Sequence, residues 1–135
     1  MVKWIDKDLI NKRGAKTTIE AATFQDAYNI IREQAKAREV IPYSKLEDKL
    51  KTNGHRKIHR GTIGGIVGEV SDQISLVTSP SVYPSSIVVH KGTKDTGDGF
   101  WTLENGTLPP STIPVDLRKK QLDEYQKNVF DKVGR

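Results

Sequence analysis

The chain has no cysteine, which excludes disulfide bonds, thiolate metal ligands and thiol nucleophiles. It also lacks long hydrophobic runs, since no apolar stretch approaches the roughly 20 residues that a membrane-spanning helix needs. The first residues, from Met1 to Asp8, are interrupted by charged side chains and do not form the hydrophobic region of a signal peptide. We therefore expect a cytoplasmic protein without a membrane segment.

The length and composition are those of a globular protein. The 135 residues are enough for one modest hydrophobic core, and 35% of them are hydrophobic while 29% are charged. The formal net charge of +5 creates a weak positive field, which attracts phosphate polymers but is shared by many proteins that bind none. The distribution of this charge is more informative than its sum.

Carboxylates are missing from the segment between Lys49 and Arg60. The same segment is rich in basic side chains, namely Lys49, Lys51, His55, Arg56, Lys57, His59 and Arg60. Such a segment favours contact with nucleic-acid phosphates, but a solvated loop has the same appearance in a sequence. Both interpretations stay open at this point.

Periodicity and capping patterns predict two helices in the first half of the chain. Residues 1–18 show no sustained period and are expected to form a basic N-terminal arm or a loosely docked segment. Thr23 followed by Asp26 resembles a capping box and predicts a helix to about Arg38, with an inward stripe of Phe24, Ala27, Ile31 and Ala35. Val40–Tyr43 is expected to be a short extended segment, because Pro42 cannot continue a helix. A second capping box, Ser44 with Glu47, predicts a helix over 45–52 that ends at Asn53-Gly54.

The clearest period in the chain belongs to a third helix that begins near Thr62. Its apolar residues are spaced by three and four positions, as one helix face requires: Ile63, Ile66, Val67, Val70 and Ile74. Glycines destabilise a helix interior by about 1 kcal/mol each relative to alanine, yet Gly61, Gly64, Gly65 and Gly68 lie here. A close approach of another backbone would explain them, and that backbone is either DNA or a neighbouring helix.

The second half predicts a β-hairpin and a last helix. Ser86–His90 and Phe100–Leu103 have strand composition, and the glycines and aspartates between them suit a hairpin turn. Residues 105–114 are a proline-containing linker before a helix over about 115–133, with Leu122, Tyr125 and Val129 on one side. This helix fits a dimer contact, a second basic face or core packing. We divide the chain into an arm (1–18), a winged-helix domain (19–104) and a linker with a C-terminal helix (105–135).

Four short segments carry a family resemblance. The segments Val40–Leu46, Gly61–Ile66, Pro84–Val89 and Gly97–Phe100 resemble the DNA-binding domain of alkylguanine-DNA alkyltransferases and alkyltransferase-like proteins, over less than half of the chain. The resemblance implies an α+β fold with a winged helix-turn-helix core, and DNA contact through the third helix. The chain departs from the family at two positions. Ser85, Ser86 and Ile87 stand where the family has cysteine, histidine and arginine, so the alkyl acceptor is missing. Gly61 occupies the place of the arginine that replaces a flipped base, and Arg60 precedes it.

Catalytic and metal sites are poorly matched by the sequence. The Gly92–Gly99 loop has Asp98 where a phosphate-binding loop needs lysine, and Asp95 with Asp98 lacks the further oxygen ligands of a calcium site. His55 and His59 have a spacing compatible with zinc but no evident third ligand. Ser85 and Ser86 lie near His90 without a motif that supplies an oxyanion site. We expect no cofactor, no metal and no catalysis.

Two functions follow from these patterns. The first is non-catalytic binding of double-stranded DNA by the basic loop, the third helix and the wing. The expected contacts are Lys49, Lys51, Arg56, Lys57, Arg60, Thr62, Lys91 and Lys94. The alternative is a protein–protein adaptor built on a winged helix, with the C-terminal helix as its docking surface.

Overall fold

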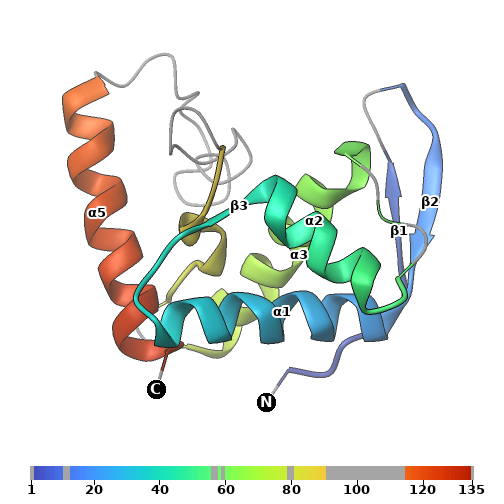
Figure 1. Cartoon of the computed structure of the whole chain (residues 1–135), viewed down its shortest axis with the longest axis horizontal. Helices are drawn as coiled ribbons and strands as arrows, with labels where there is room; N and C mark the ends of the chain where they lie inside the picture. The colour runs from blue at the N-terminus through green and yellow to red at the C-terminus, as the bar shows by residue number, and fades with distance from the viewer. Residues whose placement is uncertain are drawn as a thin grey trace.

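The computed structural model describes residues 2–10, 13–55, 58, 60–78, 81–90 and 115–134, without the side chains of residues 60, 61, 115–118 and 121. The fold is α+β. A central group consists of α1 (Ala21–Lys36), α2 (Tyr43–Thr52) and α3 (Arg60–Val77). Figure 1 shows α5 (Val115–Lys132) on one side of this group and a hairpin of β1 (Lys7–Ile10) and β2 (Lys16–Ile19) on the other.

The three central helices pack on one another, and their apolar stripes form most of the core. Helix α1 contacts both α2 and α3, and α2 contacts α3. The stripe predicted for α1 is confirmed, because Phe24, Ala27, Ile31 and Ala35 are all buried. All five apolar residues predicted to line one face of α3 are likewise buried, at 5% exposure or less. Burial of these stripes is the main term that stabilises the helices.

The helix starts differ from the sequence prediction. Helix α1 begins at Ala21 with Glu20 as its N-cap, and neither this residue nor Pro42, the N-cap of α2, makes a side-chain capping bond. The predicted caps at Thr23 and Ser44 are therefore wrong. Instead, the backbone N–H of Ala21 donates to Oδ1 of Asp6 over 2.8 Å, so that a carboxylate from the N-terminal segment caps α1. The predicted end of α2 is confirmed, since Gly54 follows it with φ of +94°.

The N-terminal segment, expected to be an arm or a loosely docked segment, contains a hairpin that packs on α3. Strands β1 and β2 pair in antiparallel register, with Lys7 opposite Ile19 and Ile10 opposite Lys16. Gly14 has φ of +82° in the connection between them. One face of the hairpin is turned inward, with Leu9 partly buried and Ile19 buried. Each strand has only two residues that face inward, and an alternation this short cannot be recognised in the sequence.

A second, parallel strand pair joins the two halves of the fold. The short extended segment predicted before α2 is confirmed as β3 (Ile41–Pro42), which pairs with β4 (Val88–Val89) after a 3-10 turn, η1 (Pro84–Ile87). Within the predicted strand over 86–90, only β4 is extended and paired. Its expected hairpin partner over 100–103, the wing and the 105–114 linker lie outside the described residues.

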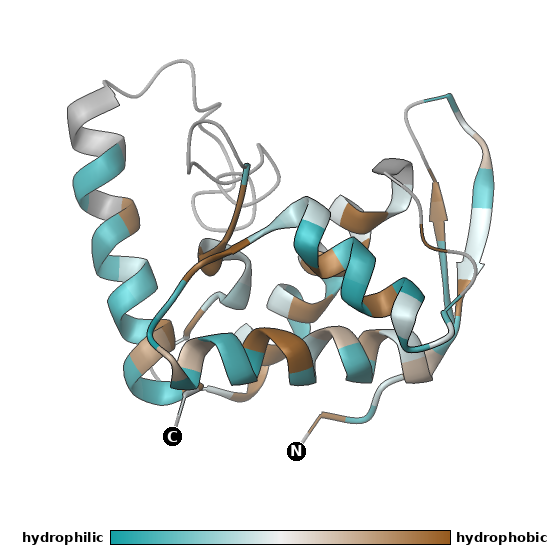
Figure 2. Ribbon diagram, viewed as in Figure 1, coloured by the Kyte–Doolittle hydropathy of each residue, from teal (hydrophilic) through white to brown (hydrophobic). Residues whose placement is uncertain are grey.

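Helix α5 belongs to the core of the molecule. It contacts η1 and α1, and its apolar residues Leu122 and Val129, with Val133 beyond its end, are at most 5% exposed. Core packing, one of the three interpretations left open, is therefore what the structure shows. Figure 2 shows hydrophilic residues along much of this helix's visible surface. In the part of the chain that the structure describes, none of the helices combines the length and the apolar character that crossing a membrane requires.

Candidate nucleic-acid interface

The exposed face of α2 carries lysines that the sequence analysis singled out. Lys49 and Lys51 are exposed, as is Lys45 one turn earlier. Lys51 Nζ lies 3.3 Å from a carboxylate oxygen of Glu47, whereas Lys45 and Lys49 form no ion pair with any residue that the structure describes. An open depression of about 320 Å³ runs between α1 and α2 beside them, lined by Ile30, Lys45, Asp48, Lys49, Thr52 and Asn53. This face is cationic but not free of carboxylates.

A chain of side-chain hydrogen bonds ties the segment after α2 to α1. His55 Nδ1 lies 3.0 Å from Oγ1 of Thr23, and His55 Nε2 lies 2.9 Å from Oδ2 of Asp26. The side-chain amide of Asn53 donates to the same Asp26 oxygen over 2.9 Å. The four side chains come from two places about 30 residues apart, and no local pattern in the sequence predicts their meeting. They fix the backbone just before the most basic part of the segment.

The basic segment is held on both sides. Ile58 is only 3% exposed and belongs to the core, so Arg56 and Lys57 lie in the chain between a hydrogen-bonded residue, His55, and a buried one. The side chains of Arg56, Lys57 and Arg60 themselves lie outside the described residues, as do Lys91 and Lys94 of the expected wing. The structure thus locates the backbone anchors of the expected interface, and the positions of these five cations stay predictions.

The N-terminal half of α3 offers a bare backbone surface. Residues 60–68 contain no carboxylate, and an added Cβ at Gly64 or Gly68 would meet nothing within 4 Å. At Gly65 the nearest atom is Leu9 Cδ1 at 3.1 Å, so the hairpin accounts for this glycine. Thr62 is only 3% exposed, because it lies on the buried side of the helix, and this excludes it from the exposed interface in which we expected it.

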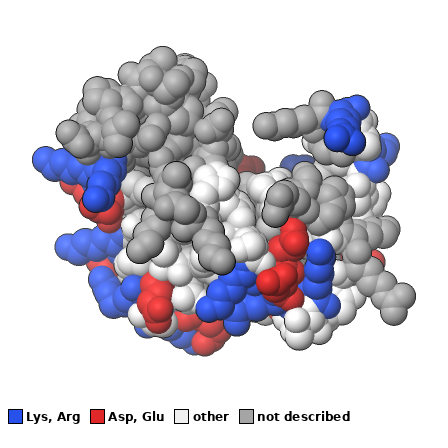
Figure 3. Space-filling model, turned by 45° about the horizontal axis from the view of Figure 1, so that its top comes forward, with Lys and Arg blue, Asp and Glu red and all other residues white. Residues whose placement is uncertain are grey.

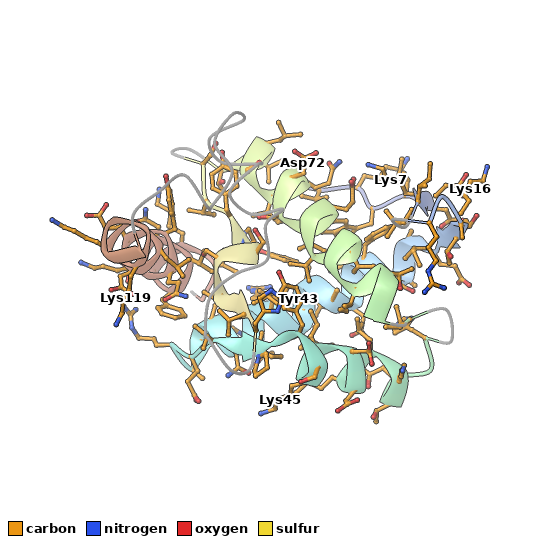
Figure 4. The ribbon with its side chains drawn as sticks, turned by 90° about the horizontal axis from the view of Figure 1, so that it is seen from above. Lys7, Lys16, Tyr43, Lys45, Asp72 and Lys119 are labelled. Atoms are coloured by element: carbon orange, nitrogen blue, oxygen red, sulfur yellow. The ribbon has the colours of Figure 1, made fainter. Side chains whose placement is uncertain are left out.

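The C-terminal half of α3 has the opposite character. Glu69 and Asp72 lie on its partly exposed side, and Lys7 of β1 forms an ion pair with Glu69. Figure 4 shows Lys7 and Asp72 on the same side of the molecule, away from Lys45. A polyanion lying along the whole of α3 would meet these carboxylates, so only the first half of the helix suits such a ligand.

Ser85 and Ser86, the two serines that lie near His90 in the sequence, are buried. Ser85 is 2% exposed and donates from Oγ to Oγ of Ser71 over 2.8 Å, while Ser86 is fully buried. The backbone oxygen of Ser86 accepts from the side-chain amide of Gln126 on α5 over 2.9 Å. His90 is exposed and its ring lies 5.1 Å from that of Tyr43. These contacts hold η1 between α3 and α5 and keep both hydroxyls away from solvent.

The described residues do not assemble a metal site. Both ring nitrogens of His55 are occupied by Thr23 and Asp26, and His59 lies outside the described residues, as does the Gly92–Gly99 loop. No group of three histidine or carboxylate side chains suited to a metal ion occurs in the described part of the chain.

In comparisons with known proteins, no family model matches this chain, and no curated protein or solved structure does.

Proposed function

We propose that this chain is a non-catalytic protein that binds double-stranded DNA, with a helix-turn-helix formed by α2 and α3. The observation that supports the proposal most is the anchoring of His55 and Ile58, two described residues of the carboxylate-free sequence 49–60, just before the bare N-terminal half of α3. The winged helix and the likeness to alkyltransferase-like proteins are part of this proposal.

The N-terminal end of α3 is suited to phosphate contact. Backbone N–H groups of a first helical turn are unpaired within the helix, and the helix dipole places partial positive charge there. Helix α3 has no acidic residue in this turn. Cations from segment 49–60 reinforce the same end, and the absence of a side chain at Gly64 allows a sugar–phosphate backbone to approach the helix closely.

The carboxylates of α3 limit how the helix meets DNA. Contact through residues 60–68 leaves Glu69 and Asp72 beyond the phosphates, as in helix-turn-helix proteins whose recognition helices read bases with their N-terminal residues. Affinity then comes mainly from phosphate contacts, and specificity is modest.

The test is the combined variant Arg56→Ala, Lys57→Ala and Arg60→Ala, compared with the wild type on a duplex of about 20 base pairs by fluorescence anisotropy. The loss of three phosphate contacts reduces the magnitude of the slope of log affinity against log salt by about 2.7, at roughly 0.9 per contact. Affinity at moderate salt falls, while the circular dichroism and thermal unfolding stay those of the wild type. The matched control replaces Lys119 and Lys120, two exposed cations of α5, and retains the wild-type slope.

A protein adaptor is the second candidate, and one observation favours it. Leu76 and Val77 at the end of α3 are 72% and 53% exposed. Of the apolar stripe of α5, the docking surface expected from the sequence, Leu122 and Val129 are buried inside the molecule and Tyr125 is partly buried, so little of the stripe is available to a partner. Absence of duplex binding by the wild type at about 50 mM salt would favour the adaptor over the DNA-binding proposal.

A further inference from the structure

The outer face of the β1–β2 hairpin carries an exposed isoleucine beside Lys16, whose Nζ lies 3.4 Å from a carboxylate oxygen of Asp8 on the same face. Side chains alternate across each strand, so Leu9 and Ile19 face the core while Asp8, Ile10, Lys16 and Thr18 share the opposite face. Ile10 is 71% exposed, and it is paired directly with Lys16, whose side chain is 64% exposed. Cross-strand partners in an antiparallel pair are close neighbours, so the apolar and cationic side chains lie together.

The end of the hairpin is also free of carboxylates. Between Ile10 and Thr18 the sequence contains Lys12, Arg13 and Lys16 and no acidic residue. Arg13 and Lys16 are both exposed. Figure 3 shows lysine and arginine side chains gathered at this end of the hairpin.

Two contacts fix the direction of the hairpin relative to α3. Leu9 lies against Gly65, and Lys7, two residues earlier in β1, pairs with Glu69, which is four residues later in α3. Strand β1 therefore runs in the direction opposite to α3, and its end at Ile10 is directed toward the helix N-terminus. Figures 1 and 4 show the same arrangement, with Lys16 at the outer edge of the molecule. The hairpin end and Ile58, the described residue of the basic sequence just before α3, thus lie at the same end of α3.

From this arrangement we infer that the β1–β2 hairpin is a second DNA-contacting element, which enters the minor groove beside the site of α3. Arg13 and Lys16 contact the phosphates that border the groove, and Ile10 contacts sugars and base edges within it. Aliphatic side chains carried into a minor groove between cations are a known means of binding and bending DNA. The inference rests on the proposed function, because it needs the duplex to lie at the N-terminus of α3.

The charge pattern favours DNA over other ligands with an apolar and an anionic part. A lipid surface also attracts an exposed isoleucine flanked by cations. However, the described hairpin presents one exposed isoleucine on this face, not the extended apolar face that interfacial binding requires, and the cationic sequence 49–60 directly precedes the same end of α3 along the chain. Vesicle binding is therefore one of the outcomes that the experiment has to distinguish.

The experiment measures duplex affinity by fluorescence anisotropy as a function of salt for three variants of the full chain. In the double variant Arg13→Ala/Lys16→Ala, the magnitude of the slope of log affinity against log salt decreases by about 1.8, and duplex affinity falls roughly tenfold at moderate salt. Ile10→Ser lowers affinity roughly fivefold and leaves the slope unchanged, because no phosphate contact is lost. The charge-retaining variant Arg13→Lys/Lys16→Arg binds like the wild type, which excludes a purely structural effect.

Two further measurements separate the possible failures. A minor-groove-binding polyamide, added in excess, removes the difference between Ile10→Ser and the wild type if Ile10 enters that groove. If the wild type binds duplex DNA and the hairpin variants bind equally well, this inference is wrong and the proposed function stands. If the wild type binds no duplex, both are wrong, and binding of wild type but not Ile10→Ser to phosphatidylserine vesicles would assign the hairpin to a lipid surface.

Discussion

Single residues show that the ends of the helices are set by contacts remote in the sequence. Asp6, 15 residues before Ala21, caps α1, although Thr23 and Asp26 have the spacing of a capping box. Thr23 instead contacts His55, and Asp26 accepts hydrogen bonds from His55 and Asn53. The residues that a local pattern assigns to capping are thus used to position the segment that follows α2.

The two capping residues give a paired prediction. Replacing Asp6 by alanine removes the acceptor for the Ala21 N–H and lowers the free energy of unfolding by about 1 kcal/mol. Replacing Ser44 by alanine lowers it by less than about 0.5 kcal/mol, because Ser44 does not cap α2. Urea denaturation of both variants checks this, and a larger loss for Ser44→Ala than for Asp6→Ala would contradict it.

A substitution at Gly64 is expected to change the free energy of unfolding and the duplex affinity in opposite directions. Alanine at this position meets no atom within 4 Å and increases helix propensity, so Gly64→Ala raises the free energy of unfolding by up to about 1 kcal/mol. In the proposed DNA complex, the same methyl group obstructs the approach of a DNA backbone to α3 and is expected to lower duplex affinity. Thermal unfolding and fluorescence anisotropy measure the two effects on one protein sample.

The matched control for this variant is Asn128→Ala, which also raises helix propensity at an exposed position but lies on α5. It is expected to stabilise the fold and leave duplex affinity unchanged. Unchanged duplex affinity of Gly64→Ala, with the stability gain observed, would show that DNA does not approach the helix at this glycine.

At the scale of elements, long periodic segments could be predicted from the sequence and short ones could not. The stripes of α1 and α3 each extend over about three turns, so their buried residues are readable from the sequence. Each hairpin strand has four residues, and β4 has two and pairs with β3, 46 or more positions earlier. Such pairings depend on how the helices bring the strands together, which no local pattern specifies.

The hairpin carries a pH-dependent contact. The hydrogen bond from Thr18, followed by that from Lys16, lowers the pKa of Asp8 below its ordinary value of 3.8. A carboxylate whose pKa is lowered on folding stabilises the folded form above its unfolded pKa, and this contribution is lost as the pH falls through the folded pKa. The hairpin is therefore expected to loosen below about pH 4.

Amide hydrogen exchange of the β2 residues measures this loosening. Asp8→Asn removes the carboxylate, and Thr18→Val removes the hydrogen bond that lowers its pKa most. After correction for the intrinsic effect of pH on amide exchange, both variants show a weaker pH dependence of β2 exchange between about pH 2 and 4. A pH dependence equal to that of the wild type in both variants would contradict the assignment to Asp8.

At the scale of the whole molecule, the last helix, α5, packs on the first helix, α1. Gly134, just after α5, lies so close to α1 that an added Cβ would be 2.6 Å from the backbone oxygen of Ala35. Arg38 reinforces the contact, since its guanidinium pairs with Asp131 at 2.9 Å and lies over the ring of Phe130. Val129 and Val133 thus belong to the common core, whereas Leu122 and Tyr125 of the predicted apolar side pack with Tyr83 in a separate small cluster.

This packing makes Gly134 intolerant of a side chain. Gly134→Ala forces backbone atoms apart at the junction of α1 and α5 and lowers the free energy of unfolding by about 1–3 kcal/mol. Urea denaturation with far-ultraviolet circular dichroism measures the loss. An unchanged unfolding midpoint would show that α5 adjusts its position without cost.

The candidate site was predictable in part. The carboxylate-free run from Lys49 to Arg60 and the glycines of α3 are visible in the sequence, because charge and the lack of a side chain are properties of single residues. The burial of Thr62, the anchor at His55 and the carboxylates on the exposed side of α3 depend on helix rotation and tertiary contacts. The position of the hairpin end near the start of α3, on which the further proposal rests, likewise follows only from tertiary contacts.

The salt dependence of duplex binding by the wild type tests the central claim most directly. About five phosphate contacts from segment 49–60 and the start of α3 predict a slope of log affinity against log salt near −4 to −5, and the hairpin cations make it steeper. A shallow slope near zero, or no binding of a duplex of about 20 base pairs at 50 mM salt, would contradict the account.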